Sequence, residues 1–153
     1  MNRLIVFMFM LLLTGCVNSN LIDVNMETPE NSWIYSKSVK ATFDVKDPSL
    51  AYNLLFKIRN TADYRYSNIY VVMRLKGDSL SKSTRYQFQL AKADGTWLGK
   101  GSGDLYSSTF SLLKNFRFPK AGKYELEVEQ NMRDNPLVGI SDVGVTVETA
   151  NKD

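Results

Sequence analysis

The 153-residue chain contains no histidine and only one cysteine, Cys16. Ser-His-Asp and Cys-His catalytic sites both need an imidazole as general base, so the absence of histidine excludes them. It also excludes zinc, copper and non-haem iron sites that use histidine ligands, and one cysteine cannot build a structural zinc site. Because Cys16 has no partner for an intramolecular disulfide, packing alone must stabilise the fold. The residue types left for chemistry are carboxylates, Lys, Tyr and Ser.

Dense basic clusters and long apolar runs are absent as well. Lys and Arg total 19 against 16 Asp and Glu, and the basic residues are scattered along the chain. Nucleic-acid binding needs clustered Lys or Arg facing phosphates, so we expect no nucleic-acid partner. The apolar run Leu4–Leu13 is about half of the roughly 20 residues that a helix needs to cross the hydrocarbon core. We therefore do not expect this run to span a membrane.

The N-terminus instead has the layout of a secretory signal, with Arg3, the apolar run, and small residues before Cys16. Its end, Leu13-Thr14-Gly15-Cys16, resembles the lipobox of bacterial lipoproteins. The resemblance implies cleavage before the cysteine, a thioether-linked diacylglycerol on its sulfur, and acylation of the new N-terminus. Several acyl chains hold a protein stably on a membrane, because each buried methylene contributes about 0.8 kcal/mol. The alternative is a buried N-terminal strand with the cysteine in the core.

The chain is predicted to divide into three segments. Residues 1–15 form the lipoprotein signal peptide, and residues 16–32, rich in Asn, Asp and Glu, form the lipidated N-terminus and a polar tether. In residues 33–149 apolar and polar side chains alternate, which is typical of half-buried β-strands, and no segment has a convincing helical period. We predict a single all-β domain for this segment, an antiparallel β-sandwich of Ig-like or jelly-roll-like type.

Seven to nine short strands are expected, with loops at 60–68 and 132–139. Asp94-Gly95 predicts a hairpin turn between two strand-like runs. Gly122 leads into a strand whose first large residue, Tyr124, fits the corner of a sandwich. The expected strands are 39–45, 52–59, 69–75, 86–90, a short one beginning at 97–98, 110–113, 116–118, 124–128 and 143–147.

Three stretches together resemble the gliding-motility lipoprotein GldH family of bacterial cell envelopes. They are residues 58–70, residues 94–106 with the run Asp94-Gly95-Thr96-Trp97-Leu98-Gly99-Lys100-Gly101, and residues 118–144 with the run Gly139-Ile140-Ser141-Asp142-Val143-Gly144. The resemblance covers most of the chain from Trp33 to Glu148, and the lipobox matches too. It implies a membrane-anchored envelope lipoprotein, associated in gliding relatives with surface motility and its linked secretion machinery. It implies no known enzyme activity and supplies no catalytic residues.

We accordingly assign no catalytic, metal-binding or cofactor-binding residue, and we expect no enzyme activity. Aromatic faces are used both by sugar-binding sites and by partner-binding sites. Arg65 and Arg133 lie in loops beside Asp63 and Asp134, and local ion pairs with these acids are the alternative to a role in recognition. Tyr64 and Tyr66 fall in a polar loop and are expected to be exposed, whereas most other aromatic residues should be core. The candidate interaction surface consists of Tyr64, Arg65, Tyr66, Trp97 and Arg133.

Other functions stay open at this point. A β-sandwich with surface aromatic residues could bind glycans, with Trp97 as the leading contact. A carboxylate hydrolase would need two acids across a cleft, roughly 5 to 9.5 Å apart, such as Glu125 and Asp104. The glycine-rich run 99–104 lacks the spacing of a phosphate-binding loop and is interpreted as a sharply bent strand.

The expected location is the cell envelope. Val17 follows the cysteine, where an Asp is typical of retention at the inner membrane in familiar bacteria. This favours the outer membrane, and the absence of an acidic run directly after Cys16 favours the face towards the periplasm. The expected partners are the membrane, through the acyl chains on Cys16, and other envelope proteins.

Overall fold

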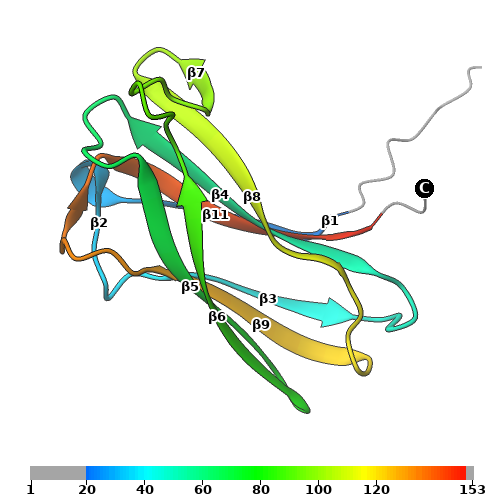
Figure 1. Cartoon of the computed structure of the whole chain (residues 1–153). Helices are drawn as coiled ribbons and strands as arrows, with labels where there is room; N and C mark the ends of the chain where they lie inside the picture. Colours follow the sequence, from blue (N-terminus) through cyan, green and yellow to red (C-terminus); the bar gives the residue numbers. More distant parts are fainter. Residues whose placement is uncertain (1–19, 151–153) are drawn as a thin grey trace, which may run out of the picture.

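The computed structural model describes residues 20–150, so the signal peptide and Cys16 lie outside the described residues. Two antiparallel sheets pack face to face, as the sandwich prediction required (Figure 1). No helix among residues 20–150 is long and apolar enough to cross a membrane. The elements are β1 Asn20–Glu27, η1 (a 3-10 turn) Pro29–Asn31, β2 Ser32–Trp33, β3 Val39–Val45, β4 Tyr52–Thr61, β5 Asn68–Gly77, β6 Leu80–Gln89, β7 Lys100–Ser102, β8 Leu105–Phe116, β9 Gly122–Gln130, β10 Leu137–Val138 and β11 Ile140–Thr149.

The strand order is that of a jelly roll. One sheet has the order β1-β11-β4-β8-β7, the other has the order β3-β9-β5-β6, and β10 and β2 form a small separate pair. Among the long strands, the first pairs with the last, and the following ones pair inward in turn: β1 with β11, β3 with β9, β4 with β8 and β5 with β6. Successive pairs fall in opposite sheets, which is the rolled-up double ribbon of the jelly roll and not the Ig arrangement.

Side chains that alternate along the strands fill the space between the sheets. Leu54, Phe56 and Ile58 of β4 are at most 1% exposed, as are Val71 and Met73 of β5. The intervening residues face outward, because successive side chains of a strand point to opposite faces. The same alternation places Val39–Val45 in β3 with the bounds that the sequence predicts.

The tether prediction for residues 16–32 is wrong from Asn20 onward. β1 pairs with β11 along its length, and Ile22, Val24 and Met26 pack against the core. The Thr28 hydroxyl then donates a hydrogen bond to the Ile140 carbonyl, which fixes the chain after the strand. The segment orders because a neighbouring strand satisfies its backbone and its apolar side chains cover one edge of the core. The domain therefore includes residues 20–32 and does not begin at residue 33.

Several strand bounds also differ from the expectation. The short strand expected at 110–113 lies within one long strand, β8, which ends at Phe116, so residues 117 and 118 of the strand expected at 116–118 lie outside it. The strand expected at 86–90 begins earlier, as β6. The run at 97–98 forms only an isolated bridge between Ala91 and Trp97, around the expected Asp94-Gly95 turn. The Tyr124 hydroxyl donates to the carbonyl of Lys120, four residues upstream, as expected for a residue at a sandwich corner.

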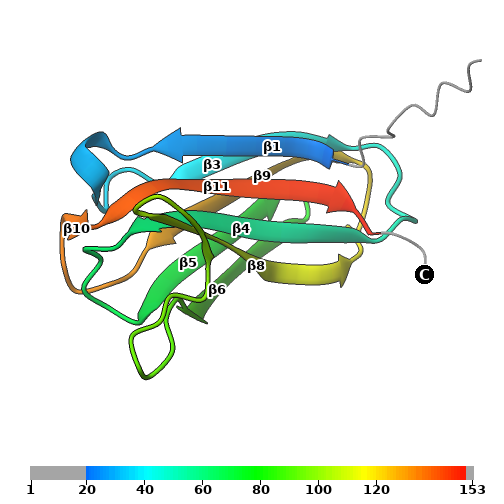
Figure 2. The same cartoon turned by 90° about the horizontal axis from the view of Figure 1, so that it is seen from above.

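The strand register gives the sandwich two distinct ends. Asn20 pairs with Glu148 at what we call the terminal end, and Glu27 pairs with Asp142 near the opposite end, the loop end. In Figure 2 the terminal end lies on the right and the loop end on the left. Loops 46–51 and 117–121 lie at the terminal end, and loops 28–37, 62–67, 90–99 and 131–136 lie at the loop end.

Candidate functional site

The five residues of the candidate surface all lie at the loop end, although they come from three separate loops. Tyr64, Arg65 and Tyr66 follow β4, Trp97 follows β6, and Arg133 follows β9. The rings of Tyr64 and Tyr66 lie 5.8 Å apart, and those of Tyr64 and Trp97 lie 6.4 Å apart. The fold therefore brings the three aromatic residues into one cluster, which Tyr106 extends at 5.6 Å from Trp97.

Tyr64 is buried, contrary to the expectation that it is exposed. Only 3% of the residue is accessible, and its hydroxyl donates to the Asn68 carbonyl at 2.9 Å. Burial raises the pKa of the Tyr64 phenol far above its ordinary value, and nearby Tyr66 and Asp134 act in the same direction. A tyrosine in a polar loop can be buried at little cost when a local carbonyl accepts its hydrogen bond. Tyr64 thus supports the loop end from inside and is not available to a partner.

Arg65 is exposed, whereas Tyr66 is half-buried against the core and so is less exposed than the sequence predicts. The Arg65 side chain is 73% exposed, and its guanidinium lies over the Tyr66 ring, 5.5 Å from the centroid. The Tyr66 hydroxyl donates to Asp134 Oδ2 at 2.6 Å, and this hydrogen bond raises the pKa of the phenol. Arg65 Nη1 lies 3.7 Å from the same carboxylate. Asp134 therefore joins the loop after β4 to the loop after β9.

The loop after β9 depends on Gln130, which the sequence analysis did not single out. Gln130 is 2% exposed. Its Nε2 donates to the carbonyls of Asp134 at 3.0 Å and Trp33 at 3.4 Å, and its Oε1 accepts from the Met132 amide at 2.8 Å. One buried carboxamide thus holds both sides of the loop that carries Arg133.

Replacing Gln130 with Leu is expected to lower the free energy of unfolding by about 2 to 4 kcal/mol. The change leaves buried backbone groups without partners, and each such group costs about 1 to 3 kcal/mol. Urea unfolding of the full chain, followed by pulse proteolysis, measures the effect. Gln89→Leu is the matched control, because the Gln89 amide donates only to a nearby carbonyl at an exposed position. Equal losses for the two variants would contradict the role given to Gln130.

A pocket of about 360 Å³ opens on the outer face of the β3-β9-β5-β6 sheet, beside the loop after β9. Two arginines, Arg85 and Arg133, contribute to it, and none of its lining residues is a carboxylate. Of the candidate surface it includes Tyr66 and Arg133. The other lining residues are Asn68, Tyr70, Asn131 and Met132.

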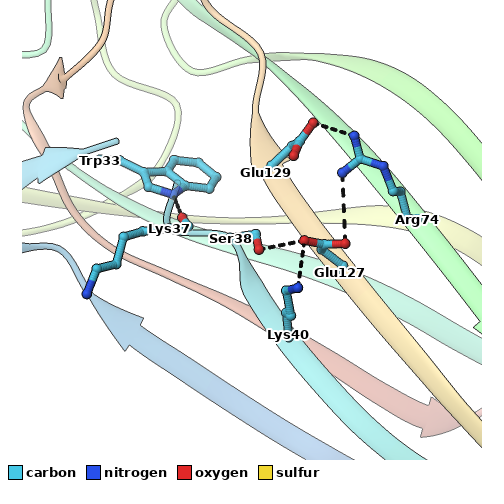
Figure 3. A network of polar contacts seen from close by, with 7 residues as sticks. All are labelled: Trp33, Lys37, Ser38, Lys40, Arg74, Glu127 and Glu129. Carbon is cyan, nitrogen blue, oxygen red and sulfur yellow. Dashed lines mark hydrogen bonds and ion pairs between the residues drawn. The ribbon is translucent and has the colours of Figure 1, made fainter. Parts of the chain in front are cut away.

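The same sheet face carries a row of carboxylates that are already paired. Figure 3 shows Glu127 between Ser38, Lys40 and Arg74. The Ser38 hydroxyl donates to it at 2.6 Å, the Lys40 ammonium lies 3.2 Å away, and Arg74 also binds Glu129 at 2.6 Å. Partial burial pushes the pKa of Glu127 up, but the bonds from Ser38 and Lys40 outweigh it and hold the pKa below its ordinary value. Such a carboxyl stays ionised near neutral pH and is not suited to act as a general acid.

The carboxylate pair considered for a hydrolase is not brought together. Glu125 lies on β9 near the terminal end, opposite Lys76 of β5. Asp104 lies in the turn before β8, at the loop end of the other sheet, where its carbonyl accepts from the Ala62 amide. A separate hollow of about 600 Å³ over the β1-β11-β4-β8 face has no aromatic residue in its lining, and its Arg59 is bound to Asp142 at 2.6 Å. Within residues 20–150 no group of three or more metal-binding side chains is gathered.

Comparison with known proteins gives consistent matches over nearly the whole chain. The model of a family described as GldH lipoprotein matches residues 20–147. A protein of Christiangramia forsetii named "Gliding motility lipoprotein GldH homolog" is 32% identical over 154 residues, covering 94% of this chain and 93% of the relative. "Gliding motility lipoprotein GldH" of Flavobacterium johnsoniae is 26% identical over 155 residues, covering 96% of each chain. These matches confirm the family resemblance inferred from the residues.

Proposed function

Because the chain belongs to the GldH lipoprotein family, we propose that it is a lipid-anchored envelope protein whose sandwich binds other envelope proteins without chemistry of its own. The two relatives are named for gliding motility, and we assign this chain to the same machinery as an assembly component. Its location in this proposal is the outer membrane, facing the periplasm, because Val17 and not Asp follows the lipobox cysteine.

The observation that carries the proposal is the short sequence spacing between Cys16, the proposed site of the lipid, and the first described strand. Cys16 lies only four residues before Asn20, the first residue of β1. Four residues span at most about 14 Å even when fully extended. The terminal end of the sandwich must therefore stay close to the membrane surface once Cys16 carries acyl chains.

This geometry directs the loop end away from the membrane. The strands run between the two ends, and β1 pairs with β11 from Asn20 at the terminal end to Glu27 near the loop end. Arg65, Tyr66 and Arg133 are then presented to the periplasmic space, where other envelope proteins can reach them. A surface of partly exposed aromatic residues and arginines has the composition of a protein-binding site.

Cys16→Ser is expected to move the protein from the membrane pellet to other fractions by at least about tenfold, because a protein without acyl chains loses its anchor. The uncut leader should also slow its migration on a gel. A Cys16→Ser chain that carries Asn18→Cys is the matched control, since it restores a thiol outside the lipobox. Unchanged pelleting and migration of Cys16→Ser would contradict the anchor.

The binding role is tested in growing cells with a photo-crosslinking amino acid at single positions. Position 65 or 133 at the loop end should give adducts with defined envelope proteins. Positions 46 and 120, exposed at the terminal end, serve as matched controls and should give no protein adduct of the same size. The absence of any protein adduct from the loop end would refute the binding role.

A further inference from the structure

We propose that the pocket formed by Arg85, Tyr70, Asn131 and Arg133 binds an acidic segment of the partner protein, with Arg85 holding a carboxylate through two hydrogen bonds. The proposal rests on the proposed function in one respect, that the loop end is where the partner docks. It adds the chemistry of the contact and a residue, Arg85, that lies outside the candidate surface found from the sequence.

The Arg85 guanidinium is held in place before any ligand arrives. It lies over the Tyr70 ring at 3.9 Å from the centroid, and its Nε donates to Asn131 Oδ1 at 2.6 Å. Asn131 is itself fixed, because its backbone N–H donates to the Tyr70 carbonyl at 2.8 Å. The Tyr70 amide donates to Met132 Sδ at 3.2 Å, which pins the loop a second time. A planar guanidinium fixed on one edge leaves its two terminal nitrogens free for a carboxylate.

The positive charge at this pocket is not balanced within the described part of the chain. No carboxylate of residues 20–150 lies within ion-pair distance of Arg85 or Arg133. The acids of the same sheet face, Glu127 and Glu129, are bound by Arg74. Near the pocket, the Asp134 carboxylate is paired with the Arg65 guanidinium. Two unpaired guanidinium groups over one hollow favour an anionic ligand.

The two tyrosine rings beside the pocket are covered by arginines, and this favours a peptide ligand over a sugar. Sugar binding uses an open aromatic face, but Arg85 lies over the Tyr70 ring and Arg65 lies over the Tyr66 ring. The pocket is open and its lining mixes Met132 and two tyrosines with amides. Such a surface suits an acidic side chain accompanied by apolar neighbours from a protein segment. In the proposed orientation its place at the loop end, opposite the end where Asn20 lies, separates it from the headgroups of the anchoring leaflet.

The test uses the full lipidated chain in mild detergent and a fluorescein-labelled peptide, Gly-Glu-Glu-Glu-Tyr-Gly, with binding followed by anisotropy. A control peptide with Gln in place of each Glu, the Gln twin, measures the part of the binding that does not depend on the carboxylate charges. A hydrogen bond to a charged group contributes about 1.5 to 3 kcal/mol, so Arg85→Gln should weaken binding roughly 10- to 100-fold. Arg85→Lys should recover only part of it, because an ammonium cannot bind a carboxylate in the same two-point geometry. Arg117→Gln removes the same charge at the terminal end and should leave binding within about twofold.

Each outcome decides the proposal. Preference for the Glu peptide, lost in Arg85→Gln and kept in Arg117→Gln, supports it. No preference over the Gln twin, or unchanged binding in Arg85→Gln, overturns it. Displacement by inorganic phosphate but not by acetate assigns the pocket to phosphoryl groups and also overturns it. In cells, a partner that still crosslinks at position 65 in Arg85→Gln as in the parent refutes this contact while leaving the proposed function standing. No partner in the parent chain refutes the function itself.

Discussion

Replacing Trp33 with Ala is expected to lower the free energy of unfolding by about 3 to 5 kcal/mol, the range for removing a large aromatic side chain from a packed core. Trp33 is completely buried and its ring stacks on Phe56 at 6.2 Å between centroids. Its Nε1 donates to the Lys37 carbonyl at 2.5 Å. Because Trp33 sits in β2, opposite Leu137 of β10, its loss also weakens the small sheet that closes the loop end.

Pulse proteolysis over a urea series measures this loss with the full chain. Trp33→Phe is the matched variant, because it keeps an aromatic ring against Phe56 and removes the indole hydrogen bond. We expect it to cost about 1 to 3 kcal/mol, mainly from the unpaired Lys37 carbonyl. A Trp33→Ala loss below about 1 kcal/mol would mean that the loop end is not closed by this side chain.

The fold class follows from the alternation of apolar and polar residues, but the order of the strands does not. Alternation decides which face of a strand is buried, as at Leu54, Phe56 and Ile58, and it holds in either sandwich type. Which strand lies beside which depends on contacts far apart in the sequence, such as that of Asn20 with Glu148. The sequence pattern is therefore compatible with both the Ig-like and the jelly-roll-like alternatives, and the strand pairings distinguish them.

For the first strand, β1, the polar composition of the segment and its alternating pattern predict different structures. Ile22, Val24 and Met26 alternate with Asp23, Asn25 and Glu27, which is the same signal that identified β3. Composition alone predicts a tether here, because half of the residues are polar. An edge strand needs only one apolar face, so a polar composition does not argue against it.

The candidate site was predicted in part. The loops that carry Arg65, Tyr66, Trp97 and Arg133 do meet at one end, and Tyr64 belongs to the cluster although it is buried. The alternation along β9 predicts that Gln130 is buried, because it continues the inward-facing positions Tyr124, Leu126 and Val128. No such pattern indicates Arg85, because its position over Tyr70 arises from the pairing of β5 with β6. Residues of a site that meet across strands are found only when the neighbours are known.

The second large effect is expected at Gly139, whose backbone has a φ of 92°. A Cβ at this position would lie 2.7 Å from the Tyr64 Cα and 2.9 Å from the Tyr64 nitrogen. The residue cannot shift easily, because its amide donates to the Asn31 carbonyl and its carbonyl accepts from the Thr61 amide. Gly139→Ala therefore adds a steric clash to a backbone strain of about 1 to 2 kcal/mol.

Gly103→Ala separates these two contributions. Gly103 also has a positive φ, 61°, but no atom lies within 4 Å of the Cβ that would be added. We expect Gly139→Ala to lower the free energy of unfolding by at least about 2 kcal/mol more than Gly103→Ala, and urea unfolding measures the difference. The clash pushes on Tyr64, which supports Tyr66 and Trp97, so crosslinking from position 65 should fall as well. Equal stability losses for the two glycine variants would show that the contact with Tyr64 is not a rigid one, and the support given to Tyr66 from below would have to come from Asp134 alone.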